Sequence, residues 1–144
     1  MEFAEFLPHR GAKGHIATEL EQLFRRVAFN VAVGNRDDHL QNHGFILTDT
    51  GWHLAPAFDV NPNIAKGDHV LNIDETDNRP SVVTVIDSGE WYVGSKDRAA
   101  QIVEEVVKIT RSWRERAITL QLARVDIETT VAAFAATETW HRKN

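Results

Sequence analysis

Three side chains with oxygen ligands, Asp37, Asn42 and Asp59, are the residues of this sequence best suited to chemistry. Asp37 and Asn42 have the D-x-x-x-x-N spacing of loops that catalyse phosphoryl transfer. In such loops the carboxylate accepts or orients the proton of the attacking hydroxyl. The amide oxygen and a second carboxylate hold Mg²⁺ on the phosphates of ATP. Asp59 can supply that second carboxylate, so the three residues predict Mg²⁺-dependent phosphoryl transfer from ATP.

The first two of these residues lie in a polar loop that follows a helix. Apolar residues recur at steps of three and four from Ile16 to Val31, which predicts an amphipathic helix over 16–33. Residues 34–44 are polar and have glycine at both ends, which is typical of a loop. Asp, Asn and Gly are also common in ordinary turns, so the loop alone is weak support for catalysis.

A β-hairpin is expected between Asn42 and Asp59. Residues 45–47 and 52–54 have the composition of short strands, and Thr, Asp, Thr and Gly between them form a good turn. The second strand carries the chain back, so Asp59 can lie near Asn42. Two prolines within residues 55–62 then predict an ordered irregular segment.

The rest of the chain has a mainly helical pattern. An apolar stripe that follows a candidate cap at Ser95 predicts a helix that can run on to Leu120. Asp126 is expected to cap a last helix. The composition of residues 82–86 fits either a strand or a helix, and their length does not decide between the two.

Residues 1–14 are broken by Pro8 and by two glycines, and we expect them to be a frayed start. The helical patterns and the hairpin together predict a mainly α (α+β) fold. The length of 144 residues fits a single domain over 1–144, which is long enough to bury a core.

The overall composition excludes several classes of protein. Hydrophobic residues make up 42% and charged residues 26%, which excludes a disordered or fibrous chain. The formal net charge of −5 lacks the basic footprint of a direct nucleic-acid binder. No apolar run reaches the roughly 18 residues that a membrane helix needs. The chain has no cysteine and no basic region typical of a signal peptide at its start, so we expect a cytoplasmic protein.

One long stretch of the sequence resembles a known family. Residues 23–62 read LFRRVAFNVAVGNRDDHLQNHGFILTDTGWHLAPAFDVNP and resemble the C-terminal domain of the HipA family of bacterial serine/threonine kinases. In that family a helix leads into a GN-x-D-x-H-x-x-N loop, and a hairpin and a P-A-Y-D-like segment follow. All three are present here in this order, with Phe58 in place of the commoner Tyr. Residues 95–122 also resemble the helical tail of the family, and the resemblance implies a protein-kinase-like C-terminal lobe.

The resemblance implies a role for each candidate residue. Asp37 matches the catalytic carboxylate, and His39 matches a histidine that positions the loop. Asn42 and Asp59 match the Mg²⁺ ligands. ATP is the implied phosphoryl donor, and the acceptor is a serine or threonine of a protein, with an aminoacyl-tRNA synthetase as the best-known target class. Members of the family act as toxins paired with a DNA-binding antitoxin, so such a partner is expected.

Part of the kinase machinery is missing from these residues. A kinase needs a lobe that covers the nucleotide phosphates and supplies a lysine to them. The sequence contains neither G-x-G-x-x-G nor G-x-x-x-x-G-K-[ST], and Gly11-Ala12-Lys13-Gly14 is a poor substitute without a preceding strand. We therefore expect a C-terminal lobe that is inactive alone, whose N-terminal lobe is absent or comes from a separate chain.

Two other functions remain open on the sequence. A kinase remnant without its N-terminal lobe could serve only to bind a partner. The metal site of a hydrolase is the other alternative, formed by the histidines and acids of this region: His39, His43, Asp37, Asp38 and Asp59. The histidines are four residues apart, but nothing predicts a helix that would place both on one face. In the kinase hypothesis Asp38 hydrogen-bonds to loop amides.

Overall fold

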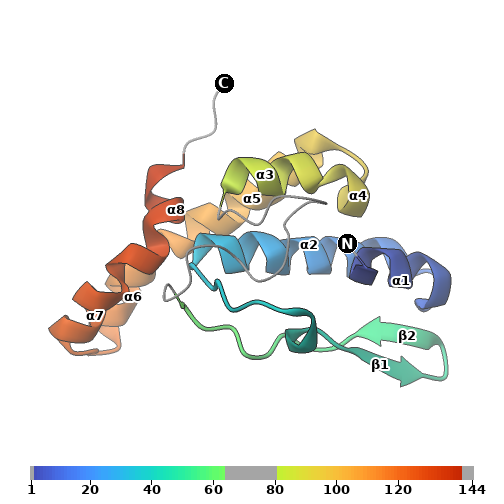
Figure 1. Ribbon diagram of the computed structural model, residues 1–144, viewed down its shortest axis with the longest axis horizontal. Helices are drawn as coiled ribbons and strands as arrows, with labels where there is room; N and C mark the ends of the chain where they lie inside the picture. The colour runs from blue at the N-terminus through green and yellow to red at the C-terminus, as the bar shows by residue number, and fades with distance from the viewer. Residues whose placement is uncertain (1, 64–80, 141–144) are drawn as a thin grey trace.

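The computed structural model describes residues 2–63 and 81–140, where the chain is mostly helical (Figure 1). The mainly α fold with one small antiparallel sheet is confirmed. No helix in the described ranges is both long and apolar enough to cross a membrane. In chain order the elements are α1 (Glu2–Arg10), α2 (Ile16–Ala32), η1 (Leu40–Asn42), β1 (Phe45–Thr48), β2 (Gly51–Leu54), α3 (Val82–Ser88), α4 (Glu90–Val93), α5 (Lys96–Thr110), α6 (Trp113–Thr119), α7 (Arg124–Thr130), η2 (Val131–Phe134) and α8 (Ala135–Thr139).

The core of the fold lies between α2 and α5. The apolar stripe of α2 buries Leu23 and Phe24, and that of α5 buries Ile102 and Val103. Helices α3 and α4 pack against the same pair, where the ring of Tyr92 lies 5.5 Å from that of Phe24. Each buried side chain of this size contributes about 1.5–3 kcal/mol. The α2–α5 pair is therefore a stable base for the loop that leaves the end of α2.

The expectation of a frayed start is wrong for residues 2–10, which form helix α1. Leu7 is fully buried, and α1 packs against α2. These apolar contacts outweigh the helical hydrogen bond that Pro8 cannot donate. Phe6 also stacks on Phe45 of the hairpin, with ring centroids 4.5 Å apart. The start of the chain therefore supports the hairpin.

The predicted hairpin is confirmed. Strand β1 pairs antiparallel with β2, with Phe45 opposite Leu54, and each strand extends one residue further toward the turn than predicted. The backbone N–H of Ala12 donates to the carbonyl oxygen of Trp52 (2.9 Å). This bond ties β2 to the segment that follows α1, so the hairpin is fixed to the helical part of the fold.

The helix predicted from Ser95 onward is divided in two. The Ser95 hydroxyl caps α5 by accepting the backbone N–H of Arg98 (3.2 Å), as predicted, but α5 ends at Thr110 and α6 begins at Trp113. The hydroxyl of Ser112 donates to the carbonyl oxygen of Ile109 (2.8 Å) at this break. A side chain that bonds to the backbone in this way competes with the helical pattern, which favours the interruption.

The structure decides two further predictions, one for residues 82–86 and one for Asp126. Residues 82–86, which the sequence left between strand and helix, lie in α3, where Ser81 caps the helix by accepting the N–H of Thr84 (3.4 Å). Asp126 does not cap α7, because that helix begins at Arg124 and Asp126 lies within its first turn.

Candidate active site

The loop after α2 begins at Gly34, where its conformation requires glycine. Gly34 has a φ of +65°, and an ideal Cβ there would lie 2.4 Å from the carbonyl oxygen of Ala133. The hydroxyl of Thr137 in α8 donates to the carbonyl oxygen of Ala32 in the last turn of α2 (2.7 Å). The C-terminal elements η2 and α8 therefore hold the point at which the loop leaves α2.

Asn35 connects the start of the loop to the segment that carries Asp59. Its Nδ2 donates to Asn30 Oδ1 (3.3 Å) and to the carbonyl oxygen of Asp59 (3.5 Å). Asn35 also forms a parallel bridge with Asn63, in which Asn63 N donates to Gly34 O (2.9 Å). The hairpin thus returns the chain to the start of the loop.

Asn42 ends the turn η1 and is buried at 9% exposure. Its backbone N–H donates to the carbonyl oxygen of His39 (2.8 Å), and its Nδ2 donates to that of Asp37 (3.2 Å). The amide nitrogen donates a hydrogen bond inside the loop, which leaves the amide oxygen, Oδ1, as the atom suited to coordinate a cation. The turn also fixes the Asn42 side chain relative to the backbone at Asp37.

Asp59 is exposed and has a left-handed φ of +54°. Asp adopts this region more readily than most residues, and strain of this kind is common at functional sites. Its Oδ1 accepts a hydrogen bond from Asn61 Nδ2 (3.1 Å). An exposed carboxylate on a segment that is fixed to the loop is suited to bind a hard cation.

His39 is half-buried, and its Nδ1 is buried without a hydrogen-bond partner within residues 2–63 and 81–140. The hydrogen bond by which His39 holds the loop is made by its carbonyl oxygen, which accepts the N–H of Asn42. A positioning role for its imidazole stays a prediction.

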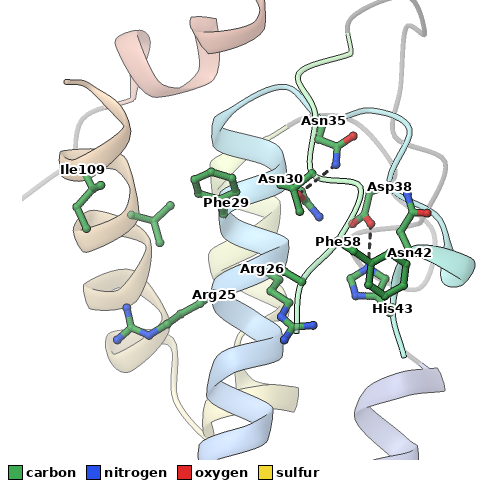
Figure 2. Close-up of a pocket in the computed structure, with 13 residues that line it drawn as sticks. Arg25, Arg26, Phe29, Asn30, Asn35, Asp38, Asn42, His43, Phe58 and Ile109 are labelled. Carbon is green, nitrogen blue, oxygen red and sulfur yellow. Dashed lines mark hydrogen bonds and ion pairs between the residues drawn. The ribbon is translucent and has the colours of Figure 1, made fainter. Parts of the chain in front are cut away.

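Asp38 forms a contact that the sequence analysis did not predict. Its Oδ1 lies 2.8 Å from Nε2 of His43, and both side chains are buried. The expectation that Asp38 bonds to loop amides is therefore wrong, because its carboxylate faces His43 across the turn (Figure 2). The only signal in the sequence was an acid and a histidine five residues apart on either side of a turn, which is too common to be informative.

A cavity of about 440 Å³ lies beside the loop (Figure 2). Its apolar walls include Phe29 of α2, Ile109 of α5 and Phe58 of the segment after β2, and the Asp38–His43 pair lies in its polar wall. Neither of the two predicted phosphoryl-transfer carboxylates is among its lining residues. Asn42, the third predicted site residue, does line it, so the cavity borders the predicted site at Asn42.

One group that lines this cavity, Arg26, and one group of the core, Tyr92, have shifted pKa values. Burial lowers the pKa of the Arg26 guanidinium, whose Nη2 donates to the carbonyl oxygen of Ala55. Burial, with a smaller contribution from the negative charge of Asp38, raises the pKa of Tyr92 to about 12. Both shifts follow from the burial of these side chains, which disfavours the charged form.

The hydrolase alternative receives no support from the described ranges. Within residues 2–63 and 81–140, no group of three or more His, Cys, Asp or Glu side chains is placed to hold a metal ion. The imidazole of His43 is paired with the buried carboxylate of Asp38, whereas Asp59 is exposed.

Comparison with known families agrees with the order of the motifs. Residues 1–113 match the family model of the HipA-like C-terminal domain. This match covers most of the chain, and the protein therefore belongs to the family of HipA-like C-terminal domains. A search of curated proteins found no match.

Proposed function

We propose that this chain is the C-terminal catalytic lobe of a HipA-like serine/threonine protein kinase, which transfers a phosphoryl group from ATP to a hydroxyl of a protein. The observation that carries the proposal is the bridge between Asn35 and Asn63. It fixes the segment of Asp59 against the loop that contains Asp37 and Asn42. The hydrogen bond from Asn35 Nδ2 to the carbonyl oxygen of Asp59 supports the same arrangement.

The donor atoms of the loop fit Mg²⁺. This ion prefers the oxygens of carboxylates and amides. Asn42 uses its Nδ2 inside the loop and so presents Oδ1, while Asp59 offers an exposed carboxylate. Bound between them, Mg²⁺ would neutralise the charge that develops on the phosphates.

Asp37 is assigned to the hydroxyl of the protein substrate. It lies between two fixed points of the loop, Gly34 at the contact with Ala133 and Asn42 at the end of η1. A carboxylate on a backbone that is held on both sides can accept or orient the proton of the attacking hydroxyl. A positioned base of this kind contributes roughly 100- to 10,000-fold to the rate.

The phosphates also need a cover, which we assign to an N-terminal lobe outside these 144 residues. This assignment is supported by the absence of a glycine-rich phosphate motif from the sequence. Strand β1 exposes Ile46 and Leu47, at 50% and 62%, on opposite faces of the hairpin, and either side chain offers that lobe an apolar contact. The chain alone is then expected to bind Mg²⁺–nucleotide weakly and to phosphorylate nothing.

Binding of Mn²⁺–ADP tests the proposal, because Mn²⁺ can replace Mg²⁺ and its binding is measured by relaxation of water protons. The wild-type chain is expected to bind, and Asp59→Asn and Asn42→Ala are expected to weaken binding by at least about tenfold. Asp49→Asn, which changes an exposed acid in the hairpin turn, should bind like the wild type. Binding that is absent, or that is equal in Asp59→Asn and the wild type, would contradict the proposal.

A second candidate function is a partner-binding domain without catalysis. The surface between α6 and α7 favours it, because Leu120, Leu122 and Val125 are 72%, 52% and 63% exposed. Leu120 and Leu122 also line one cavity, and exposed apolar side chains that lie together commonly mark a contact with another protein. The same Mn²⁺–ADP measurement separates the two functions, since a domain that only binds a partner gains nothing from Asp59.

A further inference from the structure

The Asp38–His43 pair connects the two ends of the turn that carries Asn42. Its two atoms are 2.8 Å apart, and the side chains of His43 and Asp38 are only 5% and 9% exposed (Figure 2). A buried polar group that loses its partner is not compensated by water, so a pair this deep is strongly held together. The pair therefore fixes the distance between the backbone at 38 and at 43.

Each member of the pair is next in sequence to a residue of the proposed site. Asp38 follows Asp37, and His43 follows Asn42. Between them, Asn42 is bonded through its backbone to His39 and through its amide to the carbonyl of Asp37. The pair thus closes a ring of hydrogen bonds around the turn, and a change in its length would move both site residues.

We infer that Asp38 and His43 are positioning residues for Mg²⁺–nucleotide binding, which set the separation of Asp37 and Asn42 without touching the metal or the nucleotide. This inference rests on the proposed function. Groups that orient a metal ligand from behind change metal affinity by roughly 10- to 100-fold when they are removed.

The chain contains a matched control pair outside the loop. Glu19 Oε1 lies 2.8 Å from Nδ1 of His53, and Glu19 Oε2 also accepts the backbone N–H of Leu54 (2.6 Å). This pair joins α2 to β2 and takes no part in the turn around Asn42. Its removal measures what the loss of an acid–histidine contact does to the protein in general.

The test compares Asp38→Ala, Asp38→Asn and Glu19→Ala in the full chain. The dissociation constant for Mn²⁺–ADP is measured under conditions in which circular dichroism shows each variant to be folded. Asp38→Ala is expected to weaken binding by about tenfold or more. Asp38→Asn keeps an oxygen that can accept a hydrogen bond from His43 and should restore most of the affinity. Glu19→Ala should bind like the wild type.

If Asp38→Ala does not fold, the double variant Asp38→Ala/His43→Leu takes its place. It removes both members of the pair together, so neither is left facing a lost partner and the fold should survive. It is expected to show the same loss of affinity.

Two results would overturn the inference. One is wild-type affinity in Asp38→Ala or the double variant, and the other is an equal loss in Glu19→Ala. Failure of the proposed function looks different, because the wild type and Asp59→Asn then bind Mn²⁺–ADP alike. The inference falls with it in that case.

Discussion

The α2–α5 core and the loop of residues 34–43 are held in place by different kinds of contact. In the core, side chains such as Phe24 and Ile102 share a continuous apolar contact with many neighbours. In the loop, the buried side chains are polar, and Asn35, Asp38 and Asn42 are each at most 9% exposed. Each of these polar groups depends on one or two particular hydrogen bonds.

This difference predicts how the two regions respond to substitution. An apolar contact weakens in proportion to the area that is lost, and its neighbours can partly close the gap. A buried hydrogen bond is lost completely when one of its partners is removed, because the other partner is then left unsatisfied. The loop should therefore be the more easily broken of the two regions, although the core contributes more to stability.

The largest effect is expected at the start of the loop, for Gly34→Ala. A left-handed φ costs alanine about 1–2 kcal/mol, and the overlap with the backbone of Ala133 adds to this cost, for a total of about 3 kcal/mol or more in the free energy of unfolding. Gly14→Ala is the matched control, because Gly14 has a φ of +85° but no atom within 4 Å of its ideal Cβ. Urea unfolding of both variants measures the difference in stability. Equal losses of stability would show that the overlap with Ala133 does not contribute.

On the core side, alkaline pH is expected to destabilise the protein through Tyr92. The pKa of Tyr92 is raised from 10.0 to about 12 in the folded state, so the unfolded chain loses its phenolic proton first. The stabilising effect of the neutral phenol is complete below about pH 10 and disappears as the pH rises through 12, a change of about 2–3 kcal/mol.

The titration of Tyr92 can be followed directly, because it is the only tyrosine of the chain. Tyrosinate absorbance measured against pH should show a midpoint well above the ordinary value while the protein is folded. Tyr92→Phe should remove this part of the alkaline destabilisation. A midpoint near pH 10 in the folded protein would show that the phenol is not shielded.

The junction of the two regions is tested by Thr137→Val. The substitution keeps the shape of a fully buried side chain but removes the hydrogen bond to Ala32 O and the contact with the Thr110 hydroxyl (3.1 Å). A loss of about 1–2 kcal/mol in the free energy of unfolding is expected. Thr139→Val serves as control, because Thr139 makes the same kind of bond within α8 but is exposed. A loss as small as that of Thr139→Val would mean that α8 does not brace the loop.

The smallest effect is expected at the surface of the core, for Arg98→Ala. Arg98 bonds to Glu21, which also pairs with Arg25, so the three side chains join α2 to α5. Burial alone would raise the pKa of Glu21, but the hydrogen bonds from Arg98 and Arg25 outweigh it and lower that pKa. The contribution is therefore present above the ordinary pKa of Glu21 and is lost as the pH falls through the lowered value.

Partly exposed pairs of this kind contribute about 0.5–1 kcal/mol. Thermal unfolding of Arg98→Ala at low and at high salt should show a small loss that shrinks as salt is added. Lys96→Ala, which removes the more exposed pair with Asp87, should change less. A larger loss of stability in Arg98→Ala than in Thr137→Val would reverse the order proposed for the two regions.

The sequence was sufficient for features that depend on neighbouring residues. The apolar period of α2, the hairpin and the polar loop between glycines are all local patterns, and each was predicted correctly. Helix α1 was not, because Pro8 and the glycines suggest a broken segment, whereas the helix is stabilised by burial of Leu7 against α2. The contribution of a distant contact cannot be seen in the pattern of one segment.

The same limit applies to the candidate site. The spacing of Asp37 and Asn42 and the position of Asp59 after the hairpin could be found in the sequence. The partner of Asp38 could not, because a carboxylate in a polar loop has many possible donors. The close packing that requires glycine at position 34 could not be predicted either, since its neighbour Ala133 lies about a hundred residues away and belongs to another element.

The bond between Thr137 and Ala32 has a consequence for the order in which the protein is made. Its partners are 105 residues apart, so the start of the loop cannot be braced until residue 137 has left the ribosome. The residues that build α2 and α5 emerge earlier and can pack without it. During synthesis the α2–α5 core therefore forms before the loop of residues 34–43 is fixed at its start.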